Sequence, residues 1–299
     1  MGHHHGHHQH HDASSNIKVA FFLNLGFTIV EFIGGFYTNS LAIMSDALHD
    51  LGDSLSLGMS WYFQKLSTKK ATNTYSYGYK RFSLLGAIIN AIVLCIGSVL
   101  IIKEAIPRIL HPEAADAKGM MWFAILGIVV NGAAVLKLKK GTSINERVVS
   151  MHLLEDVLGW VAVLIASIAM QFWDLPILDP ILSLLIALYV LYHVYGNVKE
   201  SLQIILQGTP KEVSASAVTE KLRTLPEISD VHDCHLWSLD GSYNILTVHL
   251  VLQKEQPSWE EIKTIKETVR TLLHDAFHLE HVTLELELLQ EDCAYKSCK

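Results

Sequence analysis

The stretch Ser150-Met-His-Leu-Leu-Glu-Asp156 lies in an apolar run, from Ser143 to Phe172, that is long enough to span a membrane. A second such run, from Ser40 to Leu66, contains His49 and Asp53, which repeat the four-residue spacing of His152 and Asp156. Residues four apart share one face of a helix, so each helix can direct an imidazole and a carboxylate toward one point. Two such helices side by side would supply two nitrogens and two oxygens, a ligand set that suits tetrahedral zinc.

The depth of the two pairs favours a functional interpretation. His49 lies nine residues after Ser40 and His152 nine after Ser143. Nine residues of helix reach roughly 14 Å, close to the middle of a ~30 Å hydrocarbon core. A charge at that depth costs at least ~2.5–3.5 kcal/mol. The alternative is a polar contact between two helices with no ligand, which explains one pair but not the same spacing twice at matching depth.

The composition is that of a membrane protein with a soluble part. Of 299 residues, 50% are hydrophobic and only 18% are charged, the mean hydropathy is +0.29, and the net charge is −7. We expect no signal peptide, because the first apolar run is long enough to stay in the membrane. The cysteines do not form a disulfide framework. They are Cys95, Cys234, Cys293 and Cys298.

Apolar runs predict an all-α bundle of six transmembrane helices over residues 16–207. The expected segments are 17–37, 40–66, 82–102, 120–138, 144–172 and 177–206. Lys and Arg gather in the loops after the second and fourth segments, which predicts that both termini are cytoplasmic. Residues 1–15 form a His-rich tail without fixed structure. We interpret it as a flexible metal-collecting arm; a purification tag is the alternative.

Residues 208–290 predict a cytoplasmic α+β domain, followed by a Cys-containing tail over 291–299. The expected order is helix 211–225, strands 228–239 and 243–252, helix 258–277 and strand 282–288. Asp240-Gly241 predicts a hairpin turn, and Ser258 with Glu261 a capping box. This αββαβ order indicates a ferredoxin-like, three-stranded sheet with helices on one face.

Several motifs together resemble the cation diffusion facilitator family of zinc and cobalt efflux proteins. They are Ser40-Leu-Ala-Ile-Met-Ser-Asp-Ala-Leu-His-Asp50, Tyr77-Gly-Tyr-Lys-Arg81 with Leu85-Gly-Ala-Ile-Ile-Asn90, His152-Leu-Leu-Glu-Asp156 and Val231-His-Asp-Cys-His-Leu-Trp237. The resemblance implies a homodimer that exchanges a divalent metal for protons at His49, Asp53, His152 and Asp156. Ser83 departs from the Glu of many members. Tyr75, Tyr77 and Tyr79 replace the loop ligands of some bacterial members, so we expect no metal there.

The residues themselves indicate how such an exchange works. A zinc ligand must be deprotonated to bind metal, and imidazole exchanges protons near neutral pH. Together with the resemblance, this leads us to expect a bacterial inner-membrane transporter that exports zinc in exchange for protons. The same ligands accept cobalt, cadmium or iron. A passive metal channel or a membrane metal sensor is the alternative. An embedded metalloprotease would need a His-Glu-x-x-His motif, which the sequence lacks, so we expect no enzyme, no cofactor and no nucleic-acid partner.

A second candidate metal cluster lies in the expected cytoplasmic sheet, where zinc would be structural or regulatory. Its members are His232, His235, His249, Glu285 and Glu287. In relatives this domain binds metal at about these places and helps to hold the dimer together. The alternative is a solvated polar face of the sheet. Cys293 and Cys298 offer two thiols, which alone do not close a site.

Overall fold

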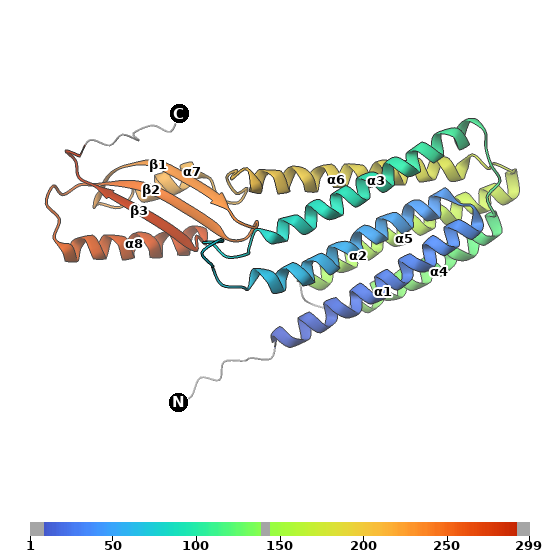
Figure 1. The fold of residues 1–299 in the computed structure, drawn as a ribbon, viewed down its shortest axis with the longest axis horizontal. Helices are drawn as coiled ribbons and strands as arrows, with labels where there is room; N and C mark the ends of the chain where they lie inside the picture. Colours follow the sequence, from blue (N-terminus) through green and yellow to red (C-terminus); the bar gives the residue numbers. More distant parts are fainter. Residues whose placement is uncertain (1–8, 139–143, 292–299) are drawn as a thin grey trace. The chain divides into compact units, whose positions relative to one another are not determined.

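The computed structural model describes residues 9–138 and 144–291, which divide into two compact units. One contains the described residues up to Lys65 together with Gly86–Val198, and the other contains Leu66–Leu85 together with the described residues from Lys199 onward. The first unit is built from long helices, and the second is built around a small sheet (Figure 1).

The long helices are α1 (Gln9–Thr38), α2 (Leu41–Ser67), α3 (Phe82–Leu110), α4 (Ala117–Leu138), α5 (Ile144–Trp173) and α6 (Leu178–Ile205). All of these except α2 are long and apolar enough to cross a membrane, which makes the chain an integral membrane protein. α2 is as long, but three aspartates in its first half lower its hydropathy. The sixth membrane span therefore stays a prediction.

Two helix boundaries differ from the expected ones. α1 begins at Gln9, so the last residues of the His-rich tail are helical, and the first eight lie outside the described residues. α3 continues past Ile102 to Leu110, and its last turn includes Pro107, which lacks the N–H that would donate to the backbone oxygen of Lys103.

Helix α2 contributes to both apolar cores of the first unit. Ala42 and Ile43 pack with Met120 of α4 and Trp160 of α5. Leu48 packs in a second core with side chains of α3 and α6. Contacts with helices on both sides hold α2 in the middle of the bundle (Figure 1).

The amino end of α2 is capped by a residue of another helix. Asp179, at the start of α6 and 2% exposed, accepts hydrogen bonds from Ser40 Oγ at 2.5 Å, Leu41 N at 2.8 Å and Ala42 N at 3.1 Å. A carboxylate at this position satisfies free N–H groups and complements the helix dipole. Asp179 therefore fixes the start of the helix that carries His49 and Asp53.

The second unit contains α7 (Ala215–Leu222), β1 (Ile228–Ser238), β2 (Asn244–Leu252), α8 (Trp259–Phe277) and β3 (His281–Glu287). β2 lies in the middle of the sheet, antiparallel to β1 and parallel to β3. The expected αββαβ order is confirmed, and so is the capping box of Ser258 and Glu261. α7 is shorter than expected because Ser214 caps it, accepting from Ala217 N.

The two faces of the sheet differ in character. Alternate residues of β2, among them Leu246, Val248 and Leu250, form one core with α7 and α8. The intervening residues, Thr247 and His249, therefore lie on the opposite face, which is where the candidate metal cluster of this domain lies.

Candidate functional site

The four residues predicted from the paired motifs come together between α2 and α5. His152 Nε2 lies 2.8 Å from Asp53 Oδ2. His49 Nε2 lies 3.8 Å from the same Asp53 oxygen and 3.9 Å from Asp156 Oδ1. The helical spacing of four residues brings each pair to one face, and the packing of the two helices brings the pairs together.

These separations suit a tetrahedral metal. With metal–ligand distances of about 2.0–2.2 Å, the ligand atoms of a zinc tetrahedron lie about 3.3–3.6 Å apart. The observed distances of 2.8, 3.8 and 3.9 Å lie on both sides of that range. One ligand atom each from His49, Asp53 and His152 lie within 4.8 Å of one another.

The surroundings leave Asp156 available for a cation. Its side chain is 9% exposed, and among the described residues its Oδ1 has no hydrogen-bond partner. A buried carboxylate oxygen without a partner is costly unless a cation or proton reaches it. His152 is 40% exposed, so the cluster is open on that side. The role of the four residues as metal ligands stays a prediction.

The second predicted cluster gathers on the polar face of the sheet. His249 Nδ1 lies 2.6 Å from Glu287 Oε1, and His249 Nε2 lies 3.2 Å from Glu285 Oε2. His232 Nε2 lies 3.2 Å from Glu287 Oε2. The strand register explains this arrangement. His232 of β1 lies opposite His249 of β2, and His249 lies opposite Glu285 of β3.

Asp233 also belongs to this cluster, although it was not among the predicted residues. Asp233 Oδ2 lies 3.5 Å from His249 Nε2, and its Oδ1 lies 3.0 Å from His235 Nε2. A register shift between His232 and His235, with φ of 45° at Asp233, turns this side chain to the same face. The signal was the run of polar residues within an otherwise alternating strand.

The other predicted metal-binding segments lie mainly outside the described residues. These are Cys293 and Cys298 and the first eight residues of the His-rich tail. In the loop between α2 and α3, Tyr77 contacts the ring of His281, and Lys80 Nζ lies 4.2 Å from the ring centroid of Tyr243. The loop thus packs on the sheet domain within the second unit.

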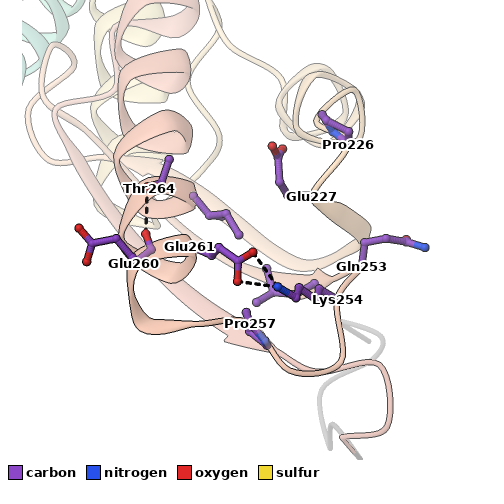
Figure 2. A pocket seen from close by; sticks show the side chains of 10 residues that line it. Pro226, Glu227, Gln253, Lys254, Pro257, Glu260, Glu261 and Thr264 are labelled. Carbon is purple, nitrogen blue, oxygen red and sulfur yellow. Dashed lines mark hydrogen bonds and ion pairs between the residues drawn. The ribbon is translucent and has the colours of Figure 1, made fainter.

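The sheet domain also has a pocket of about 660 Å³ (Figure 2). It is lined by the residues just before β1, the end of β2 and the start of α8. Two of its charged residues form an ion pair: Lys254 Nζ lies 2.7 and 2.8 Å from the two oxygens of Glu261. That contact lowers the pKa of Glu261 to about 2. The pocket lacks histidine and cysteine, and none of the residues that line it belongs to the metal cluster.

Known proteins match this chain over nearly its whole length. Residues 17–206 match the family described as "Cation efflux transmembrane domain", and residues 210–288 match "Cation efflux protein, cytoplasmic domain". A Bacillus velezensis protein named "Cadmium, cobalt and zinc/H(+)-K(+) antiporter" is 35% identical, over 94% of this chain and 92% of its own.

Two further relatives carry related names. The "Metal cation efflux system protein CzcD" of Cupriavidus metallidurans is 32% identical, over 96% of this chain and 91% of its own. The "Zinc transporter ZitB" of Escherichia coli is 30% identical, over 96% and 93%. The chain therefore belongs to the cation efflux family, a class of membrane transporters that are not enzymes.

Proposed function

We propose that this protein is a secondary active transporter that exports zinc, or a related divalent metal, from the cytoplasm in exchange for protons. The observation that carries the proposal is the convergence of His49, Asp53, His152 and Asp156 between α2 and α5. Two imidazoles and two carboxylates at these separations match the ligand preference of zinc.

The names of the relatives support transport of a divalent metal in exchange for other cations. One relative is named as an antiporter of cadmium, cobalt and zinc against protons and potassium, and another as a zinc transporter. We therefore extend the proposal to cobalt and cadmium as further cargo, and to potassium as a second ion that moves against the metal.

Competition between protons and metal for one site explains the exchange. Bound metal requires deprotonated ligands, so metal arriving from the cytoplasm displaces protons, and protons arriving from the other side displace metal. Alternating access then requires the helices that bear the site to rock against the others. α2, which packs in both apolar cores, would transmit such a movement to α3, α4, α5 and α6.

For the membrane arrangement we propose six spans within residues 16–207, with α2 as the sixth and both termini in the cytoplasm of a bacterial cell. Burial supports the inclusion of α2: Asp46 and Asp50 are 6% and 4% exposed, so its acidic residues face protein. Residues 208–290 would then form the cytoplasmic, ferredoxin-like domain.

For the sheet domain we propose a regulatory zinc site and a role in homodimer formation. The donors fit zinc, because His232, His249 and Glu287 offer ligand atoms that lie within 4.8 Å of one another. The contacts of Tyr77 and Lys80 with this domain link it to the loop between α2 and α3. Zinc binding there would reach the transport helices through that loop.

Zinc flux in proteoliposomes tests the transport proposal. The purified protein is reconstituted, a pH gradient is imposed, and zinc and proton movements are followed with fluorescent indicators. We expect zinc flux coupled to opposite proton flux, and we expect His152→Ala to abolish both. His111→Ala, an exposed histidine just after the end of α3, is the matched control and should behave as the parent.

Other outcomes separate the alternatives. Zinc flux that ignores the pH gradient and moves no protons would indicate a passive channel. Zinc binding without flux would indicate a sensor. For the sheet domain, Glu287→Gln should weaken zinc binding at the sheet cluster by about 10–100-fold, because Glu287 acts as a ligand or holds His249. Zinc binding at the site between α2 and α5 should be unchanged.

A further inference from the structure

His49 makes no close polar contact among the described residues, unlike the other histidine of the proposed metal site. His152 Nε2 lies 2.8 Å from Asp53 Oδ2, whereas His49 Nε2 lies 3.8 Å from Asp53 Oδ2 and 3.9 Å from Asp156 Oδ1. The two longer distances exceed those of hydrogen bonds. A histidine that binds metal usually has its ring oriented by a hydrogen bond from its other nitrogen. A different kind of contact must therefore orient the ring of His49.

Two aromatic rings contact the imidazole of His49 edge to face. The centroid of the His152 ring lies 5.9 Å away with an interplanar angle of 65°, and that of Tyr189 on α6 lies 6.2 Å away at 69°. Both arrangements are ones that aromatic rings prefer. Because His152 is itself a proposed ligand, Tyr189 is a contact that comes from outside the four-residue site.

Tyr189 is in turn held by residues of α5 and α6. Its hydroxyl donates to Glu155 Oε2 at 3.4 Å, and its ring packs edge to face on His193, one turn later on α6, with the centroids 4.5 Å apart. An O–H···O bond is ordinarily about 2.5–3.0 Å long, so the hydroxyl contact is weak and the ring contacts matter more. Tyr189 thus connects α2, through His49, with α5.

We propose that Tyr189 is a positioning residue that orients the His49 imidazole for metal binding and thereby favours zinc over harder ions. The inference rests on the proposed transport function and deepens it. An imidazole that rotates freely about its side-chain bonds offers its nitrogen to the metal for only part of the time. Nitrogen ligands suit zinc, whereas manganese prefers oxygen. Loss of the Tyr189 ring should therefore weaken zinc binding more than manganese binding.

The surroundings of Tyr189 allow its ring to be removed without disturbing the bundle. Its side chain is 43% exposed, and in the part of the chain that the structure describes neither apolar core of the first unit includes it. Truncation at such a position leaves no enclosed cavity, so its cost in stability should be small. A change in metal transport would then report on the site rather than on folding.

Zinc and manganese flux in proteoliposomes tests this role, with the full-length protein under an imposed pH gradient. For Tyr189→Ala we expect the zinc concentration at half-maximal flux to rise at least about tenfold, as for the loss of other groups that orient a metal ligand. Maximal zinc flux should stay close to that of the parent. At limiting metal the zinc-to-manganese flux ratio should fall by a similar factor, because manganese depends less on the nitrogen.

Two further variants separate the ring from its surroundings. Tyr189→Phe keeps the ring and removes only the hydroxyl, so it should transport both metals as the parent does. Tyr195→Ala removes another exposed tyrosine of α6 and is the matched control, which should also behave as the parent.

Thermal unfolding in detergent guards against variants that fail to fold. Without zinc, the unfolding midpoints of Tyr189→Ala and the parent should be equal. Added zinc should raise the midpoint less in Tyr189→Ala than in the parent, because a ligand stabilises the state that binds it. If Tyr189→Ala unfolds more easily without zinc, Tyr189→Leu, which keeps apolar bulk without an aromatic ring, takes its place in every measurement.

The results separate this role from the transport proposal. Parent-like zinc dependence in Tyr189→Ala would overturn the role of Tyr189, and so would an equal loss of zinc and manganese flux. An equal defect in Tyr189→Phe would assign the effect to the hydroxyl and would also overturn it. Each of these results leaves the transport proposal standing. Absence of coupled zinc flux in the parent would instead overturn the transport proposal, and the zinc-dependent rise in unfolding midpoint would still test Tyr189.

Discussion

The substitution His49→Asp should keep transport but weaken the choice of metal. It replaces the nitrogen ligand that lies 3.8 Å from Asp53 Oδ2 and 3.9 Å from Asp156 Oδ1 with a third carboxylate. Imidazole is a ligand that suits zinc, whereas carboxylate suits manganese and calcium better. The variant site should therefore accept ions that the parent discriminates against.

The distances allow an estimate of the electrostatic change. Two like charges about 4 Å apart repel by about 4 kcal/mol at an effective dielectric constant of 20. The aspartate side chain is shorter than histidine, and at about 6 Å each of the two repulsions falls to about 3 kcal/mol. The empty variant site thus carries about 6 kcal/mol of repulsion, which any divalent ion relieves equally. Because the zinc-specific nitrogen is lost, we expect the zinc-to-manganese flux ratio to fall at least about tenfold, which corresponds to about 1.4 kcal/mol.

The assay measures zinc, cadmium and manganese flux in proteoliposomes at two external pH values, since imidazole and carboxyl groups release protons over different ranges. His49→Asn is the matched variant, because it has the shape of Asp without its charge. If the metal ranking and the pH dependence of His49→Asp both equal those of the parent, His49 is not a ligand and the argument from paired motifs fails.

Deleting residues 1–12 should lower zinc flux at limiting zinc but leave maximal zinc flux largely intact, because a tethered His arm only raises the local metal concentration. Complete loss of flux would contradict this role of the arm. Gly127→Ala should lower the free energy of unfolding of the bundle by about 1–3 kcal/mol, because a Cβ there meets the buried Trp160 ring. Gly132→Ala, on the same helix with open space around it, should leave the midpoint of thermal unfolding unchanged. Burial raises the pKa of the Cys234 thiol, so its alkylation at pH 8, followed by mass spectrometry, should be slower than that of glutathione; equal rates would count against that environment.

The local signals in the sequence predicted much of the architecture. Hydrophobic runs predicted the long helices, and strict alternation predicted β3, because burial follows the period of each element. The order of elements in the sheet domain and its capping box were confirmed. The run 40–66 predicted α2 as well, although three aspartates lower its hydropathy; two of them, Asp46 and Asp50, are buried in protein.

The sequence was less informative where contacts join distant segments. The spacing of His49 and Asp53 predicted a shared face, and the structure brings that face to His152 and Asp156. Nothing in the local pattern indicated that Asp179 would cap a helix that begins 139 residues earlier, at Ser40. Nor did the sequence indicate that Asn24 of α1 would donate a hydrogen bond to the backbone oxygen of Asp50 on α2.

The cap formed by Asp179 restricts how α2 can move. Its carboxylate accepts from one hydroxyl and two backbone N–H groups within the first residues of α2, so that end cannot slide along α6 without breaking all three hydrogen bonds. A tilt of α2 about this capped end would therefore displace Asp53, which lies farther from Ser40, more than it displaces Asp46.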